Sequence, residues 1–296
     1  MKKEFLFNHL HAVIWRNENK EVTKIVHILH GMTEHINRYE KLANALTEEG
    51  VMVIGYDLRG HGKNTGDLIC ATLGVDGWHQ SIEDIHLFYE MIHKDYPNIP
   101  YYLLGFSLGS FLLREYFTKY NDDITGAIIM GTGHQPAFIL NIIMKLVHNE
   151  IKKVGYDATT DFVRNLSFGQ YNKKFKPNRT KMDWLCANED QLDEYMNDNL
   201  CRKDISAGLF YDLLNSMKKC GLSNTYENWN KQMPVLLISG NEDPVGDHTK
   251  GIQTLYKKMK QEKLNIQIKI IQNARHDLLH EASALESIHM LQNFIK

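Results

Sequence analysis

The fold of this chain is decided by one stretch, Tyr101-Tyr102-Leu103-Leu104-Gly105-Phe106-Ser107-Leu108-Gly109-Ser110, and by the helix-like residues 111–116 that follow it. A bounded apolar run that opens on aromatic residues predicts a short buried strand. The turn after it has the pattern Gly105-x-Ser107-x-Gly109, because a strand that reverses tightly into a helix leaves no room for a Cβ on either side of the serine. Such a turn strains the serine backbone and raises its hydroxyl above the sheet. A glycine-rich loop with a solvent-facing serine has the same pattern, so residues elsewhere in the chain must decide between the two.

Strands and helices alternate on both sides of this stretch. Strands are predicted at 5–7, 10–15, 23–29, 51–56, 124–130, 235–239 and 266–271, and helices at 38–49, 78–94, 249–259 and 281–294. The first two strands are expected to form an antiparallel pair. Strands that alternate with helices imply a mostly parallel sheet covered on both faces. The predicted fold class is therefore α/β.

The alternation breaks between residues 131 and 233. This interval is far longer than a single crossover helix needs, and it is helix-like and rich in large apolar residues. We predict a core at 1–130 and 234–296, and a crossover at 131–233 that contains a helical cap over roughly 135–220. Five apolar residues of the cap are candidates for binding a hydrocarbon chain: Phe138, Ile142, Ile143, Leu146 and Trp184. The alternative is that the stretch 138–147 only packs the cap onto the sheet.

A serine hydroxyl needs a base, and the base needs an acid to orient it. In open α/β sheets such residues lie just past the carboxyl ends of the strands. Asp243 follows the strand at 235–239 and His276 follows the strand at 266–271, so the order Ser107, Asp243, His276 is that of nucleophile, acid and base in α/β-hydrolases. Pro244 favours Asp243 because it fixes the loop beside the strand end. The weaker rivals are Glu242 and Asp247 for the acid, and His248 and His280 for the base.

An oxyanion hole needs two backbone donors. The N–H of Leu108 is expected at a helix N-terminus, where the positive potential suits a developing oxyanion. The second donor is predicted to be the N–H of Met32, in the segment 30–35 that follows an early strand. The alternative for that segment is a strand-end turn capped by Thr33.

Composition and charge exclude several classes of protein. The net charge of −2 and the lack of a basic stripe argue against nucleic-acid binding. No window has the apolar length of a membrane span or of a signal-peptide core. Four scattered cysteines, Cys70, Cys186, Cys201 and Cys220, suit a reducing cytosol better than a disulfide frame or a zinc site. We therefore expect a cytoplasmic protein without a metal, and the sequence leaves its oligomeric state open.

Five motifs resemble the monoacylglycerol lipase and lysophospholipase branch of the α/β-hydrolases, also called serine aminopeptidase-like hydrolases. They are His30-Gly31-Met32-Thr33-Glu34-His35, Tyr56-Asp57-Leu58-Arg59-Gly60-His61-Gly62, Gly105-Phe106-Ser107-Leu108-Gly109-Ser110, Ser239-Gly240-Asn241-Glu242-Asp243-Pro244-Val245-Gly246 and Arg275-His276-Asp277-Leu278-Leu279-His280-Glu281. The resemblance implies an α/β-hydrolase fold, ester hydrolysis through an acyl-enzyme, no cofactor and a lipid-like substrate. It also implies that the loop with Asp57 and His61 supports the site without being catalytic. One departure is Ser110, where the family often has glycine.

The predicted function is that of a serine hydrolase of carboxylic esters, with monoacylglycerol or lysophospholipid-type acyl esters as the expected substrates. The expected partner is a small ester with an acyl chain, and transient contact with a membrane surface is compatible with the apolar cap. One alternative is a peptidase that removes N-terminal residues, for which Glu189, Asp190, Asp193 or Glu194 would bind the substrate amine. Another is a non-catalytic small-molecule receptor on the same fold.

Overall fold

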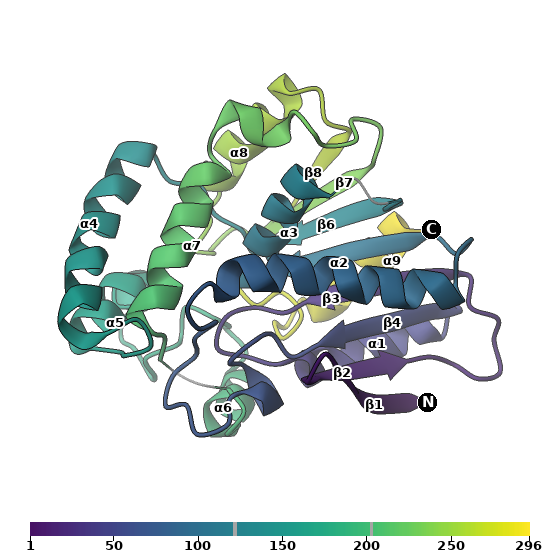
Figure 1. Ribbon diagram of the computed structural model, residues 1–296, viewed down its shortest axis with the longest axis horizontal. Helices are drawn as coiled ribbons and strands as arrows, with labels where there is room; N and C mark the ends of the chain where they lie inside the picture. Colours follow the sequence, from purple (N-terminus) through teal and green to yellow (C-terminus); the bar gives the residue numbers. More distant parts are fainter. Residues whose placement is uncertain (121–122, 202–203) are drawn as a thin grey trace.

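The computed structural model describes residues 1–120, 123–201 and 204–296, and these ranges form a sheet of eight strands in the order β1-β2-β4-β3-β5-β6-β7-β8 (Figure 1). β1 pairs antiparallel with β2, and β2 with β4, whereas all the other neighbours are parallel. The strands are β1 (Lys2–Phe7), β2 (Leu10–Trp15), β3 (Lys24–Leu29), β4 (Val51–Tyr56), β5 (Tyr101–Phe106), β6 (Gly126–Met130), β7 (Val235–Gly240) and β8 (Ile266–Ile271). The prediction of a mostly parallel α/β sheet is confirmed.

Helices cover both faces of the sheet because the buried strands carry apolar side chains on both sides. Leu103 and Leu104 are neighbours in β5, yet they belong to different apolar cores, since successive side chains of a strand point to opposite faces. One core lies under α1 (Glu40–Thr47) and α9 (Ala284–Ile295), and the other lies under α2 (Gly77–Asp95), α3 (Leu108–Lys119) and α8 (Lys250–Gln261). Burying each such leucine stabilises the fold by about 1.5–3 kcal/mol. Short 3-10 helices are η1 (Ile36–Tyr39), η2 (Gly62–Asn64), η3 (Tyr171–Phe175) and η4 (Ser223–Tyr226).

The segment between β6 and β7 is mainly helical. It contains α4 (Ala137–Val154), α5 (Asp161–Ser167), α6 (Glu189–Asn197) and α7 (Ala207–Lys219). In Figure 1, α4, α5 and α7 stand together beyond one end of the parallel strands, with α4 packed along α7. We propose that these helices are the cap that the sequence predicts. Within the described ranges, no helix combines the length and the apolar character that crossing a membrane requires.

Candidate active site

The turn between β5 and α3 holds Ser107 in a strained backbone conformation. Its φ is 48° and its ψ is −113°, a region that residues other than glycine rarely occupy. A Cβ on Gly105 would lie 2.5 Å from the carbonyl oxygen of Gly109, and a Cβ on Gly109 would lie 2.1 Å from that of Leu29. Both glycines are therefore required by close backbone contacts. The strain is held in place by the packing of the helix start against the end of β3.

The structure brings Ser107, His276 and Asp243 together at the carboxyl ends of three parallel strands. Nε2 of His276 lies 2.9 Å from Oγ of Ser107, and Nδ1 of His276 lies 2.9 Å from Oδ2 of Asp243. The carboxylate also accepts the N–H of Val245 at 2.8 Å, which fixes its plane. Since the Nδ1–H of His276 donates its hydrogen bond to the carboxylate of Asp243, Nε2 is left as an acceptor for the serine hydroxyl. Both His276 and Asp243 are buried.

Within the described residues, none of the rival acids and bases takes part in the hydrogen-bond chain through Ser107 and His276. His280 hydrogen-bonds Asp277 through Nδ1 at 2.8 Å and also contacts Arg38. Burial, together with the positive charge of Lys174, lowers the pKa of His248. Of the candidate acids, it is Asp243 that hydrogen-bonds the ring of His276, at 2.9 Å.

The two expected oxyanion donors flank Ser107. Met32 lines the same pocket as Ser107 and His276, and Leu108 is the first residue of α3. Within the part of the chain that the structure describes, neither of these backbone N–H groups has an acceptor. The N–H of Leu108 also lies at the positive end of the α3 dipole. Both groups are thus available to a developing negative charge.

His30 fixes the turn that precedes Met32. Its Nδ1–H donates to the carbonyl of Gly31 at 2.7 Å, and its Nε2 accepts the N–H of Leu58 at 2.8 Å. Burial lowers the pKa of His30 to about 4, so the ring is neutral and Nε2 can accept. The neighbouring carboxylate of Asp57 accepts the N–H groups of Ile36 and Lys63 at 2.8 and 2.9 Å. These contacts are those of a supporting loop, as the resemblance implies.

An aromatic cluster closes the pocket above Ser107. The volume of the pocket is about 20 Å³, which is room for about one water molecule. The ring centre of Trp184 lies 5.2 Å from that of His276, 5.5 Å from that of Phe168 and 4.9 Å from that of Tyr171. As it stands, the pocket therefore has no room for an ester. The aromatic cluster is defined as Phe168 and Trp184, which line the pocket, and Tyr171, which packs against Trp184. The pocket is lined by Met32, Thr33, Glu34, Phe106, Ser107, Phe168, Trp184, Leu185, Tyr195, His276 and Asp277.

The structure brings one of the five candidate cap residues, Trp184, to this pocket and leaves the four on α4 outside it. Phe138, Ile142 and Leu146 are 67, 60 and 45% exposed, and Ile143 is half-buried. Residues four apart share one face of a helix, and the buried face of α4 is a different one, formed by Leu140, Met144 and Val147. The sequence identified the apolar content of this helix but not which of its faces points outward.

The sequence analysis missed a set of charged residues that border the pocket. Arg38 donates to Glu34 at 2.9 Å and to Asp277 at 2.6 Å, and both carboxylates line the pocket with Ser107. The spacing of Glu34 and Arg38, four positions apart with opposite charges, was the available signal. Nothing in the sequence indicated that Asp277, far along the chain, would join them.

Among the described residues, His35, Asp198 and Cys201 form the one group that could hold a metal ion, with possible ligand atoms within 4.8 Å of one another. Nε2 of His35 bonds directly to Oδ2 of Asp198 at 2.7 Å. These two side chains are therefore bonded directly to each other, while, among the described residues, Nδ1 of His35 is buried without a hydrogen-bond partner.

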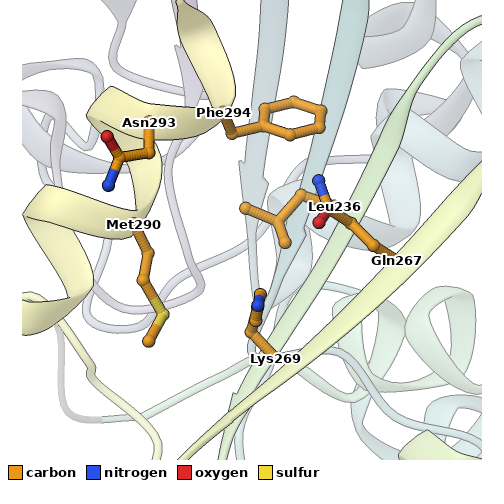
Figure 2. A pocket seen from close by; sticks show the side chains of 6 residues that line it. All are labelled: Leu236, Gln267, Lys269, Met290, Asn293 and Phe294. Atoms are coloured by element: carbon orange, nitrogen blue, oxygen red, sulfur yellow. The ribbon is translucent and has the colours of Figure 1, made fainter.

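A second pocket lies far from Ser107. It has a volume of about 220 Å³ and is formed by β7, β8 and α9 near the amino-terminal half of the strands (Figure 2). Leu236, Met290 and Phe294 provide its apolar surface, and Lys269 and Asn293 its polar surface. Because catalytic residues of parallel sheets lie at the opposite ends of the strands, this pocket is separate from the site.

Comparison with known proteins gives a family and a fold. Residues 20–283 match a family model described as serine aminopeptidase, S33. The chain is 26% identical to human monoglyceride lipase over 267 residues, covering 87% of this chain and 76% of that protein. It is 24% identical to a monoglyceride lipase homolog of monkeypox virus over 295 residues, covering 97% and 94%.

Solved structures with the same fold cover nearly the whole chain. A thermostable carboxyl esterase from Bacillus coagulans, in complex with glycerol, has a TM-score of 0.88 at 23% identity, with coverage of 100% of this chain and 99% of that one. A soluble variant of monoglyceride lipase from Saccharomyces cerevisiae has a TM-score of 0.77 at 16% identity, with coverage of 99% and 94%. These likenesses show a shared α/β-hydrolase fold.

Proposed function

The chain belongs to the serine aminopeptidase S33 family of α/β-hydrolases and is a carboxylic ester hydrolase, and we propose that it cleaves acyl esters of the monoacylglycerol or lysophospholipid type through an acyl-enzyme on Ser107. The observation that carries this proposal is the unbroken hydrogen-bond chain from Ser107 through His276 to Asp243, with both links at 2.9 Å. This is the arrangement that makes a serine hydroxyl nucleophilic.

The first half of the reaction forms the acyl-enzyme. Oγ of Ser107 attacks the ester carbonyl carbon while its proton passes to Nε2 of His276, and the carbonyl electrons move to the oxygen. The N–H groups of Met32 and Leu108 hold that oxyanion, each with a value of roughly 100- to 1000-fold in rate. Asp243 stabilises the imidazolium. When the tetrahedral intermediate collapses, the C–O bond to the alcohol breaks and His276 protonates the leaving oxygen.

The second half releases the acid. A water molecule gives its proton to His276 as its oxygen attacks the acyl-enzyme carbonyl. Collapse of this second intermediate breaks the bond to Oγ, and His276 returns the proton to Ser107. The enzyme is regenerated, and the products are a carboxylic acid and an alcohol.

The pocket supports a substrate with one apolar and one polar end. Phe106, Phe168, Trp184 and Leu185 provide an apolar surface, and a second set of side chains, Thr33, Glu34, Tyr195 and Asp277, provides a polar one. Each buried methylene of an acyl chain is worth about 0.8 kcal/mol, so a long chain favours binding once the aromatic cluster opens. The names of the human and monkeypox virus relatives support the same substrate class. The three exposed candidates on α4, Phe138, Ile142 and Leu146, would meet the chain, or a lipid surface, outside the closed pocket.

The four acidic residues that the sequence offered for binding a peptidase substrate's amine do not line the pocket. Asp193 pairs with Arg179 at 2.8 Å on the surface of α6, and Glu189 lies 3.9 Å from the same arginine. Neither they nor Asp190 and Glu194 line the pocket with Ser107. Hydrolysis of esters is therefore better supported than removal of N-terminal residues from peptides. The buried thiols of all four cysteines also support the expected cytoplasmic location.

The test combines a covalent probe with a substrate panel. A fluorophosphonate is expected to label the wild type at Ser107, and Ser107→Ala is expected to lose labelling and to reduce kcat by roughly a million-fold. Monoacylglycerols, lysophospholipids, p-nitrophenyl esters from acetate to palmitate and aminoacyl amides then define the substrate. Labelling without turnover of any ester would support the receptor alternative. A preference for aminoacyl amides would support the peptidase, and a sharp preference for acetate would exclude an acyl-chain site.

A further inference from the structure

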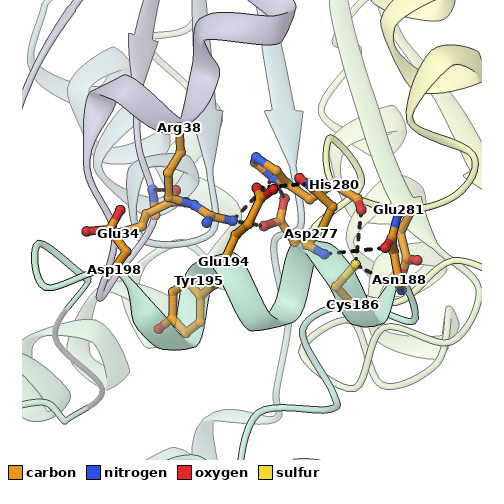
Figure 3. Close-up of polar contacts among 12 residues, drawn as sticks. Glu34, Arg38, Cys186, Asn188, Glu194, Tyr195, Asp198, Asp277, His280 and Glu281 are labelled. Carbon is orange, nitrogen blue, oxygen red and sulfur yellow. Dashed lines mark hydrogen bonds and ion pairs between the residues drawn. The ribbon is translucent and has the colours of Figure 1, made fainter.

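We propose that Glu34, Arg38 and Asp277 form a charged clamp that sets the position of the oxyanion turn relative to the catalytic base. The inference rests on the proposed function, since it concerns the geometry of that same reaction. The three residues act as positioning residues, because they support the segments that carry Met32 and His276 and do not themselves exchange protons with the substrate. Figure 3 shows Arg38 with its guanidinium group beside Asp277, and Glu34 on its other side.

At one end of the clamp, Glu34 holds the oxyanion turn. Its Oε1 accepts the N–H of Gly31 at 2.6 Å and the hydroxyl of Tyr39 at 2.8 Å. Thr33, the residue between Met32 and Glu34, has a φ of 64°, which is unfavourable for a β-branched side chain. A strained turn keeps its shape only when the surroundings over-determine it. Glu34 supplies this support through its hydrogen bonds with Gly31 and Tyr39.

At the other end, Asp277 holds the loop of the base. It is the residue directly after His276, and its backbone N–H donates to the carbonyl of Leu185 at 2.7 Å. Its Oδ1 pairs with Nδ1 of His280 at 2.8 Å, and its Oδ2 accepts from Arg38 at 2.6 Å. Burial opposes ionisation of this carboxyl, but the charges of His280 and Arg38 outweigh burial and lower its pKa. Asp277 is therefore an anion at neutral pH.

Arg38 joins the two ends. Its Nε donates to Oε2 of Glu34 at 2.9 Å, its Nη2 donates to Oδ2 of Asp277, and its guanidinium lies 5.1 Å from the ring centre of Tyr195. The side chains of the clamp are only 5–9% exposed. Buried ion pairs seldom add net stability, because desolvation offsets their attraction. What this one provides is a rigid, directional link between two loops that come from opposite ends of the chain.

The effect on the reaction follows from geometry. Met32 and His276 must hold the carbonyl oxygen and the serine proton at the same moment, and a misplacement of about 1 Å can cost about 100-fold in rate. Loss of the clamp should therefore lower the rate of acylation and leave substrate affinity nearly unchanged. If the clamp only stabilised the fold, its loss would lower the melting temperature and would not produce a loss confined to kcat with KM unchanged.

The sharpest test is a double-mutant cycle between Glu34→Gln and Asp277→Asn. These residues are linked through Arg38, and the two changes are isosteric, so packing is kept. Each is expected to slow acylation by about tenfold, while the double variant is little worse than either, because one break already opens the clamp. In an Arg38→Met background, the same two changes should have almost no further effect on the acylation rate. The matched control pair is Glu34→Gln with Glu281→Gln. Glu281 also holds the base loop, through the N–H of Arg275 at 2.8 Å, but it lies outside the clamp, so the effects of this pair should multiply.

A chemical rescue tests the central residue. Arg38 borders an open pocket of about 380 Å³, so a small guanidinium ion can reach the space that Arg38→Ala vacates. We expect Arg38→Ala to lower kcat by about 100-fold with KM within a few-fold, and ethylguanidinium to restore part of that loss. Arg59→Ala is the control, because Arg59 forms a two-point ion pair with Asp84 outside the site. It should keep its activity and show no response to guanidinium.

Two results would overturn the clamp. One is a double variant of Glu34 and Asp277 in which the two effects on the acylation rate multiply, both with Arg38 present and in the Arg38→Met background. The other is a folded Arg38→Ala with normal kcat, or with a loss that falls on KM alone. If Arg38→Ala does not fold, the isosteric cycle decides by itself. Failure of the proposed function is a separate outcome, since the wild type would then neither hydrolyse esters nor react with a fluorophosphonate.

Discussion

The two walls of the proposed active site are built by different kinds of interaction. On the sheet side, Ser107, His276 and Asp243 are fixed by directional hydrogen bonds and by a backbone turn that excludes any Cβ at Gly105 and Gly109. On the cap side, the aromatic cluster is held by ring contacts, each worth about 0.5–1.5 kcal/mol beyond burial. Within the described chain, Nε1 of Trp184 has no hydrogen-bond partner. We call the sheet side the rigid wall, because the proposed chemistry depends on its fixed geometry. We call the cap side the movable wall, because access of the substrate depends on ring contacts that can be exchanged.

The largest effect is expected from Asp243→Asn, which tests the hydrogen-bonded wall. An asparagine keeps the acceptor for the N–H of Val245 but favours the wrong tautomer of His276, so kcat should fall by about 10,000-fold. Initial rates on a short p-nitrophenyl ester measure this. The matched control is Asp247→Asn, on the same loop, which should change the rate by less than about twofold if the rigid wall is as specific as its geometry indicates. Equal losses in both variants would contradict the assignment of the acid.

The rigid wall is also the part that the sequence could predict. Ser107, Asp243 and His276 each follow an apolar strand, and parallel strands bring such positions to one edge, so chain order was sufficient. The cap could not be predicted in the same way. The residues 138–147 are apolar almost throughout, and an amphipathic pattern is needed to say which face of a helix is buried. Arg38 and Asp277 could not be predicted for a different reason. They lie at opposite ends of the chain, and only the three-dimensional fold brings them together.

A smaller effect is expected from the buried histidines of the sheet side. Burial lowers the pKa of His27 to about 3 and that of His61 to about 4, from an ordinary value of 6.5. Between pH 6 and pH 4 the unfolded chain therefore binds protons that the folded chain does not, so the free energy of unfolding falls as the pH falls. Each histidine should contribute a slope of up to about 1.4 kcal/mol per pH unit, and the contribution of His61 should decline as the pH approaches 4.

Denaturant titrations at several pH values measure that slope. His27→Phe, which suits the surrounding rings of Tyr56 and Phe88, should remove the contribution of one histidine even if it changes the stability itself. Replacing His289 by Gln, at an exposed position of α9, is the control for the substitution itself. A slope that His27→Phe does not alter would show that this ring is protonated in the folded chain as readily as in the unfolded one.

On the cap side, Trp184→Ala should produce a change of about tenfold in specificity and not in chemistry. Removing the ring widens a pocket of about 20 Å³ next to His276, so the preference should move toward longer or bulkier acyl chains. The ratio of kcat/KM for palmitate and butyrate esters measures this change. Trp184→Phe keeps most of the packing and is the control. A loss as large as that of Asp243→Asn on every ester would instead show that Trp184 belongs to the rigid wall.

The smallest effect is expected from the outer face of α4. Phe138 and Ile142 are among the most exposed large apolar residues of the chain, and they point away from the packed face of their helix. If they meet a lipid surface, replacing both by serine should lower activity on esters embedded in vesicles by about threefold, since each apolar side chain contributes only part of its transfer free energy at an interface. Activity on a dissolved short ester should not change, because neither residue reaches the pocket. Leu285→Ser, at an equally exposed position on α9, provides the control, with no loss expected on either substrate. Equal losses on the dissolved and the embedded ester would instead mean that α4 shapes the pocket from a distance, and that the movable wall extends further than the aromatic cluster.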